Sequence, residues 1–583
     1  MSLTAITAPR LIVAAAMLHL FLAVALFTAG RAGVAPALID RDGIMGSFAY
    51  DSYDYQRGAI EVTQMLRSGN VIAWATAAQP LHVKLIAVPF ALLSPLFGYS
   101  TLSAEPYNLI CYLGIVGLVF ALGRELSGHR VAVLSAAVVA LWPTFQLHTL
   151  QLLKDPLFVA AALAFLLCAI TSLVRTYPRS IGAGVTAIAV LLVLLLHLVR
   201  FSFVLMMVAI AVLILALLIL RQARERRLLF WNMAPALAVL LTALSLLPFY
   251  SHHNIERIKT SSSDQGGPSK TSADPAAQVP TLVMRIAHPE TAQHTPGDKA
   301  ARRISSIRSR FAAAYANSGS LLDTDAEFRN VNDLIRYVPR AMEIGLWAPF
   351  PHMWVSAGRR VGNVGKLLSG AETLAVYVLE LLAVVALVRE PRRIALWFVV
   401  ALVVFGATAL AFIVPNVGAI YRFRYVFWML LVVAGMTGLN ALLISRQHRA
   451  SSLKRSMIAV LIVGLLAGVP GCSSLTQASH RANATAANCA LTNFTGTSFR
   501  ALYLSPSSAS GWQENVLAGS ELKDGDTLDV QLDPTEKNIE WDMRVEGVDG
   551  RYAEWKNLKL GELSDITLVL KLAPGPTVVA EVE

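Results

Sequence analysis

Charged side chains stand at the ends of apolar runs in this sequence, where a charge is costly unless it has a partner or a function. Asp51 and Asp54 lie three residues apart, so on a helix they would share one face. A carboxylate held there could act as a general base, whereas an Asp at a helix start can also serve only the helix end. The pair marks a candidate catalytic site and leaves the choice between the two aspartates open.

Cations occur in three further segments. Lys154 and Asp155 precede a proline that opens an apolar run, Arg200 lies in a short link between two runs, and Arg422 and Arg424 open a late run. Arginine suits phosphate because its guanidinium donates a planar fork of hydrogen bonds. The alternative for each is a helix cap or an interfacial anchor. Taken together, carboxylates and cations beside apolar helices favour a substrate with a lipid tail and a phosphate.

The elements that must position these residues are membrane-spanning helices. The chain has 583 residues, of which 55% are hydrophobic and 15% charged, and its mean hydropathy is +0.56. A soluble chain would be about a quarter charged. Because a span needs about 20 apolar residues, we expect about eleven spanning helices. They lie near residues 11–29, 106–123, 131–147, 156–174, 181–196, 203–220, 228–249, 370–388, 394–414, 425–445 and 456–471.

Charge in the links predicts the orientation. The cationic links all fall on one side of this arrangement, around residues 124–130, 175–179, 221–227, 389–393 and 446–455. Positive charge marks the cytoplasmic side, so the N-terminus is predicted inside and the C-terminal tail outside, in the periplasm of a bacterial inner membrane. The first apolar block is interpreted as a span, since no clean signal-peptide cleavage site follows it.

Residues 83–98 are apolar but short, and Pro89 and Pro95 interrupt them. Both features disfavour a full span, so this segment is predicted to lie in the interface or to re-enter the membrane. Under that interpretation residues 30–105 and 250–369 form two large external loops. The second half of the later loop is apolar and aromatic, and we expect helices packed there over the active site.

The tail follows a different pattern. Residues 1–472 form the predicted membrane domain, 473–487 a polar linker, and 488–583 a small antiparallel β domain with alternating apolar and polar residues. Residues 473–583 carry a net charge of −7, which leaves +18 for the rest of the chain. That basic excess fits cytoplasmic loops and gives no indication of nucleic-acid binding.

Two residue types in the tail raise further hypotheses. Trp512, Trp541 and Trp555 could form a carbohydrate platform, although such residues more often belong to a core. Cys472 and Cys489 could pair in an oxidising compartment, and Cys472 follows a stretch that resembles a lipoprotein signal. Cys spacing predicts no structural zinc site.

The stretch DSYDYQRGAIEVTQMLRSG in the first predicted external loop resembles the corresponding loop of GT-C glycosyltransferases of the protein O-mannosyltransferase and lipid A aminoarabinose transferase superfamily. DSYDYQRGA is similar to the family's Asp-x-x-x-Tyr-x-x-x-Ala pattern through Asp51, Tyr55 and Ala59. A second alignment, counted back from MLRSG, places Asp54 at the acid, with Arg57 following it. The two alignments differ by one helical turn, and Tyr55 and Arg57 become candidates for contact with the acceptor or a glycan.

The resemblance continues over roughly residues 10–445. QPLHVKLIAVPFALLSPLFG is similar to the family's interfacial segment, with Gln79 where His or Glu is usual and Lys84 as a substitute phosphate contact. LQLLKDPLF resembles the second external acidic motif and places Asp155 there. GRELSG and IYRFRYVFWMLLVVAG are similar to a family turn and to its late Arg-rich helix start.

The resemblance implies transfer of a sugar from a polyprenyl-phosphate carrier to a lipid, polysaccharide or protein at the outer face, with inversion. A phosphate leaves without a general acid, so one base carboxylate plus cations could suffice. No cofactor is then required, and a divalent metal is optional, since no dedicated ligand cluster indicates one. A transporter or flippase, and a polymerase or ligase of lipid-linked glycans, are the competing hypotheses. The sequence names neither the sugar, the acceptor nor the oligomeric state.

Overall fold

The computed structural model describes residues 8–36, 38–46, 48–200, 203–259, 295–314, 320–324, 326–354 and 362–448, and, in short pieces, most of 487–582. These residues belong to two compact units. The first comprises Met1–Leu247, Arg310–Thr324 and Tyr337–Pro470, and the second Pro248–Ser309, Asp325–Arg336 and Gly471–Glu583. The predicted span 456–471 and almost all of the predicted linker 473–487 lie outside the described residues, as do Cys472 and the side chain of Cys489.

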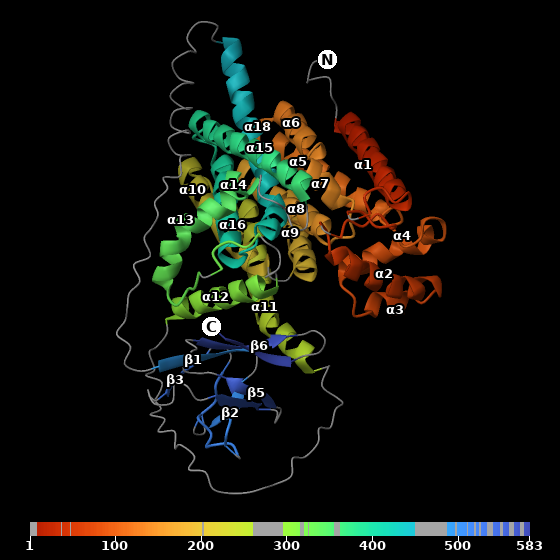
Figure 1. Ribbon diagram of the computed structural model, residues 1–583. Coiled ribbons are helices and arrows are strands. Elements are labelled where there is room, and N and C mark those ends of the chain that lie inside the picture. Colours follow the sequence, from red (N-terminus) through yellow and green to blue (C-terminus); the bar gives the residue numbers. More distant parts are fainter. Residues whose placement is uncertain are drawn as a thin grey trace. The chain divides into compact units, whose positions relative to one another are not determined.

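The described residues up to 448 are mainly helical (Figure 1). Its helices are α1 (Ala8–Arg31), α2 (Asp51–Arg67), α3 (Val71–Thr76), α4 (Leu81–Phe97), α5 (Glu105–Ser127), α6 (His129–Ala140), α7 (Pro143–Thr149), α8 (Asp155–Val174), α9 (Arg179–Val199), α10 (Val204–Glu225), α11 (Phe230–Lys259), α12 (Pro296–Ala314), α13 (Val331–Trp347), α14 (Pro351–Trp354), α15 (Gly362–Arg389), α16 (Ile394–Ile413), α17 (Val417–Phe423) and α18 (Tyr425–His448).

Eight helices of the described residues are long and apolar enough to cross a membrane, namely α1, α5, α8, α9, α10, α15, α16 and α18. The predicted span 131–147 is instead a pair, α6 and α7, bent by 67°, and would be a ninth. The bend has a local cause, because Pro143 has no N–H to continue α6 and begins α7. The predicted span 228–249 falls in α11, whose described apolar part, Phe230–Leu246, is shorter than a span.

The segment predicted to be interfacial or re-entrant forms one unbroken helix, α4, despite the two prolines inside it. One face of α4 packs on α2, with Val83, Ile86 and Phe90 buried in a shared core. The other face leaves Leu92 and Leu96 exposed. A short helix with one buried and one exposed apolar face fits the interfacial alternative rather than a hairpin that re-enters.

Helices α15 and α18 of the helical unit pack closely against each other. Gly435 and Gly438 of α18 face the backbone of α15, and a Cβ at Gly438 would stand 1.8 Å from the carbonyl oxygen of Leu382. Small residues at such positions let two apolar helices approach closely enough for dispersion contacts to hold them together. The rest of the core is continuous across α5, α6, α8, α9, α10, α16 and α18.

Helices also occupy the second half of the long loop. Residues 337–348 of the α13 region pack on α16 and α17, where Ala341 and Ile344 are buried and Gly345 lies against the backbone of Ala407. The polar stretch that begins this loop lies largely outside the described residues. The expectation of helices in this half is therefore met, and their relation to an acceptor remains a prediction.

The tail contains β1 (Ala487–Phe494), β2 (Phe499–Pro506), β3 (Thr527–Leu532), β4 (Trp541–Gly547), β5 (Tyr552–Leu558), β6 (Asp565–Lys571) and β7 (Thr577–Val582). They form a four-stranded sheet in the order β3-β1-β6-β7 and an antiparallel three-stranded sheet in the order β2-β4-β5. The prediction of a small β domain is confirmed, but β1 and β6 pair in parallel. A parallel pair needs a long connection between its two strands. The strands of the three-stranded sheet, β2, β4 and β5, lie within the connection from β1 to β6.

The substitution Gly438→Ala should lower the thermal stability of the protein, because the new methyl group would collide with backbone that cannot move aside. Overpacking of this kind costs about 1–3 kcal/mol. Thermal unfolding of the full chain in detergent, followed by tryptophan fluorescence, would measure the loss. Gly114→Ala in α5 is the matched control, since nothing lies within 4 Å of its added carbon. Equal melting temperatures for the two variants would contradict the close approach.

Candidate functional site

Arg422 joins two carboxylates that come from distant parts of the sequence. Its Nη2 lies 2.9 Å from Oδ2 of Asp51, and its Nε lies 3.2 Å from Oδ2 of Asp155. Asp51 is the first residue of α2, Asp155 is the first residue of α8, and Arg422 lies in α17. Three of the segments that the sequence marked for chemistry therefore meet at one guanidinium.

Asp155 is the buried member of this cluster. Its side chain is 6% exposed, and Arg200 and His148 also face it, with Nη2 of Arg200 at 3.4 Å and Nε2 of His148 at 3.9 Å. No side chain caps the start of α8, so the carboxylate serves the guanidinium groups rather than the helix end. A carboxylate held between two guanidinium groups stays ionised and fixes their positions.

Asp51 and Asp54, which the sequence left as alternatives, have different surroundings. The Asp51 side chain is 35% exposed and faces Arg422. Asp54 is 61% exposed and pairs with Arg57, which is itself 78% exposed, at 2.5 Å. Of the two aspartates, Asp51 lies with the cluster, whereas Asp54 and Arg57 form an exposed pair outside it.

The other predicted cations also fall into two groups, one near Asp155 and one away from it. Arg200 and Lys154 lie with Asp155, and burial, followed by the charges of neighbouring cations, lowers the pKa of Lys154. Lys84 instead donates to the carbonyl of Ala75 at 2.7 Å and makes no described contact with the carboxylates. Arg424 is buried and donates to the carbonyls of Ala348, at 2.7 Å, and Leu346, so it ties α18 to the end of α13 rather than facing Asp51.

Tyr55 and His82 close another side of the cluster. Their rings meet edge to face at 4.4 Å. Burial, and then the charges of Asp51 and Asp155, raise the pKa of Tyr55, so its hydroxyl keeps its proton. Burial lowers the pKa of His82 to about 4, with Lys154 adding to the shift. Both ring nitrogens of His82 lack a hydrogen-bond partner among the described residues.

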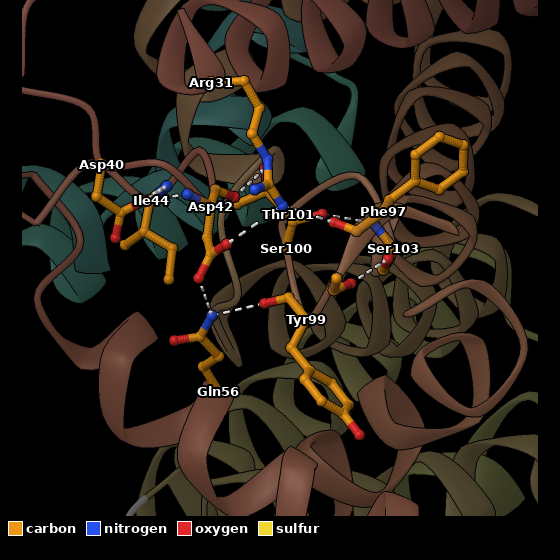
Figure 2. Close-up of polar contacts among 11 residues, drawn as sticks. Arg31, Asp40, Asp42, Ile44, Gln56, Phe97, Tyr99, Ser100, Thr101 and Ser103 are labelled. Atoms are coloured by element: carbon orange, nitrogen blue, oxygen red, sulfur yellow. Dashed lines mark hydrogen bonds and ion pairs between the residues drawn. The ribbon is translucent and has the colours of Figure 1, made fainter. Parts of the chain in front are cut away.

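A polar network orders the loop that leads to Asp51 (Figure 2). Asp40 accepts hydrogen bonds from the backbone N–H groups of Asp42 and Ile44, at 2.9 and 2.8 Å. Gln56 of α2 donates to the carboxylate of Asp42, at 3.1 Å, and to the carbonyl of Tyr99. These bonds fix the N-terminal part of α2 against the turn that connects α4 to α5.

Gln151 connects this loop to the segment that carries Asp155. It is fully buried, its Oε1 accepts from the N–H of Met45 at 2.9 Å, and its Nε2 donates to the carbonyl of Gly43 at 3.3 Å. The ring of His148 adds an edge-to-face contact with Phe48 at 5.0 Å. Hydrogen bonds to the backbone, together with Arg422, thus fix the positions of Asp51 and Asp155 relative to each other.

Sequence reasoning missed the residues that position α17. Glu372 of α15 is buried and accepts from the N–H and hydroxyl of Thr144, at 2.9 and 2.6 Å, and from the hydroxyl of Tyr421. Asn416 caps α17 by accepting from the N–H of Ala419 at 3.0 Å. An acid inside an apolar span, where a charge is costly, was the available signal for Glu372, whereas His148 and Gln151 carried none.

The tryptophans of the tail do not gather on one surface. Trp541 is fully buried in the β-domain core with Leu502 and Met543, so it cannot belong to an exposed carbohydrate platform. Trp555 packs at the edge of that core, and Trp512 lies near Tyr503 with its ring half-buried. Among the described residues no group of three or more His, Cys, Asp or Glu side chains is arranged to hold a metal ion.

Replacing Asp155 by Asn should destabilise the helical unit, because the partly buried guanidinium groups of Arg200 and Arg422 would lose their shared, buried counter-charge. Breaking a buried ion pair from one side costs about 3–5 kcal/mol. The matched control is Asp54→Asn, which removes an exposed pair worth about 0–1 kcal/mol. Thermal unfolding in detergent would measure both, and equal losses would show that Asp155 does not carry the cluster.

The state of His82 predicts a dependence of stability on pH. Its pKa is lowered from 6.5 to about 4, so the folded protein favours the neutral ring. The contribution of the neutral His82 ring to the free energy of unfolding is fully present above pH 6.5 and is lost as the pH falls through about 4. Its upper bound is about 3 kcal/mol. His82→Leu should reduce the fall in melting temperature between pH 7 and pH 4.5, and the exposed His352→Gln should leave it unchanged. Parallel pH profiles for all three proteins would contradict this prediction.

Comparisons with known proteins add little to this geometry. No protein-family model and no curated protein matches the sequence. Among solved structures, the chain is similar to the archaeal oligosaccharyltransferase AglB from Archaeoglobus fulgidus, in complex with an inhibitory peptide and a dolichol-phosphate. The identity is 12% and the TM-score is 0.35, over 78% of this chain and 54% of that one. The match therefore spans about half the length of the archaeal protein. A hypothesis of function therefore rests on the motifs and on the cluster around Arg422.

Proposed function

We propose that this protein is a membrane glycosyltransferase that moves a sugar from a polyprenyl-phosphate carrier to an acceptor, a lipid, polysaccharide or protein, at the predicted outer face. The observation that carries the proposal is the bridge from Arg422 to both Asp51 and Asp155. It brings a partly exposed carboxylate and a set of cations together beside membrane helices. These are the two kinds of group that transfer from a phosphate carrier needs.

The two carboxylates take different roles. Asp51 is the general base, because it is the more exposed of the two and lies beside a guanidinium that can orient it. Asp155 is enclosed by Arg200, Arg422 and His148, and acts by holding the cations in place. A base must reach the proton that it abstracts, and a carboxylate that is 6% exposed is poorly placed to do so.

The reaction is a single displacement. Asp51 accepts the proton of an acceptor hydroxyl, whose oxygen attacks the anomeric carbon from the side opposite the carrier phosphate. The bond from that carbon to the phosphate oxygen breaks, and the phosphate leaves with the electron pair, so the configuration inverts. Arg422, Arg200 and Lys154 stabilise the charge that develops on the phosphate, and no general acid or cofactor is required.

Burial of these cations strengthens their effect. Burial lowers the pKa of Arg200, and Asp155 opposes that shift. Arg200 also lies over the rings of Phe158 and Phe423, at 4.8 and 4.4 Å from their centroids. A cation fixed between aromatic rings and a carboxylate needs little reorganisation when a phosphate arrives, which is the condition for electrostatic catalysis.

Transfer assays on matched variants test this proposal. Membrane vesicles containing the full chain receive polyprenyl phosphate carrying radiolabelled mannose or aminoarabinose, and label in lipid, glycan and protein fractions is counted. Loss of a general base costs about 10²–10⁴ in rate, so Asp51→Asn should lower transfer by at least about a hundredfold. Arg422→Gln should have a comparable effect, and Asp54→Asn should have little.

Melting temperatures of the same variants separate a chemical defect from unfolding. The catalytic roles are wrong if Asp51→Asn and Arg422→Gln transfer label as fast as the unaltered protein. Movement of the labelled carrier across the membrane without any transfer would replace the proposal by a transporter. Transfer only from an oligosaccharide on pyrophosphate would replace it by a ligase.

A further inference from the structure

A second polar site lies at the other end of the helical unit. A cavity of about 610 Å³ opens where α5, α8 and α10 end and α6 and α16 begin. It is lined by Glu125, Leu126, Ser127, Gly128, Leu173, Val174, Arg221, Glu225, Arg392, Arg393, Ile394 and Ala395. Asp155 and Val174 are the two ends of α8, which at 1.5 Å per residue is about 30 Å long. The cavity is therefore separate from the cluster around Arg422.

Three arginines form part of its wall, and one of them is uncommitted. Arg221 is buried and donates to the carbonyls of Ser172, Leu173 and Arg175. Arg393 donates to the carbonyl of Leu126 and, at 3.1 Å, to the hydroxyl of Ser127. Arg392 is exposed and makes no hydrogen bond or ion pair within the described part of the chain. Its guanidinium is available to a ligand in the cavity.

Each carboxylate of the wall already has a cation. Glu125 accepts from two nitrogens of Arg175, and Glu225 accepts from Nε of Arg221 at 2.7 Å. Arg393 is in turn paired with Glu390, at 2.8 Å. The charge that remains for a ligand is therefore the positive charge of Arg392.

Two helix N-termini add to this positive potential. The 20-residue helix α16 begins at Ile394, and the 12-residue helix α6 begins directly after Gly128, both on the cavity wall. Neither helix has a side chain that caps its first turn. The unpaired N–H groups and the helix dipole at such ends favour an anion, and phosphate is a common one.

Apolar residues complete the wall. Leu173, Val174 and Ile394 lie at the ends of helices that are apolar enough to span a membrane, so this part of the cavity offers apolar surface to hydrocarbon. Ligand sites commonly have volumes of about 300–1,000 Å³, which includes this one. A ligand for this cavity needs a phosphate at one end and hydrocarbon at the other.

We propose that this cavity binds the phosphate headgroup of an anionic phospholipid from the membrane leaflet at that end of the helices. Arg392 pairs with the phosphate, the first turns of α6 and α16 donate to its oxygens, and the acyl chains run along Leu173 and Val174. The site is distinct from the proposed carrier site, and its occupant is a bound lipid rather than a substrate. It ties the ends of five helices together through one headgroup.

The test measures lipid binding by the purified full chain. Native mass spectrometry in detergent, with phosphatidylglycerol added over a range of concentrations, gives an apparent Kd. Because a charge-assisted contact is lost without a change in packing, Arg392→Glu should weaken binding by at least about fivefold. Arg224→Glu is the matched control, since Arg224 is exposed near the same end of α10 but does not line the cavity.

Two further ligands distinguish the sources of the phosphate. Phosphatidylcholine, whose headgroup has no net charge, should bind at least about fivefold more weakly than phosphatidylglycerol. Glycerol 1-phosphate, which has no acyl chain, should not compete at equal concentration. The proposal is overturned if the two arginine variants weaken phosphatidylglycerol binding equally, if phosphatidylcholine binds as tightly, or if glycerol phosphate competes fully.

Discussion

A guanidinium placed among apolar helices is stable only where carboxylates face it, and this requirement governs the helical unit. Arg422 satisfies it with Asp51 and Asp155, which are more than a hundred residues apart in the chain. The start of α2, the start of α8 and α17 must meet for this charge to be neutralised. The cost of leaving any member unpaired makes the cluster both a structural centre and a preorganised electrostatic site.

Several buried polar residues support the cluster of Arg422, Asp51 and Asp155. Gln151 binds the backbone of the first loop, Glu372 binds the start of α7 and the hydroxyl next to Arg422, and Asn416 caps α17. Each fixes a segment that carries one member of the cluster, which is how a site within about an ångström of its working geometry is maintained.

The sequence predicted the individual helices and strands better than the contacts between them. Apolar blocks of span length located the membrane helices, because that signal is local, and alternation located the strands. Only one of Asp51 and Asp54 faces the arginines, and the rotation of α2 about its axis decides which one. The hydrogen bonds of Gln56 fix this rotation, and the spacing of residues in the sequence does not reveal it. The partners of Asp155 likewise depend on folding of distant segments, and the bend before Pro143 was hidden because the apolar run continues through it.

The parallel pairing of β1 with β6 has a consequence for how the tail is made. β1 is the first strand of the domain to be synthesised, yet one of its two neighbours begins at Asp565, within the last twenty residues of the chain. Non-local strand pairs form late, because a long loop must close before they bring any gain. The four-stranded sheet therefore cannot be completed until β6 has been synthesised, after all of β1 to β5. Until then β1 can pair only with β3, and one of its edges stays open.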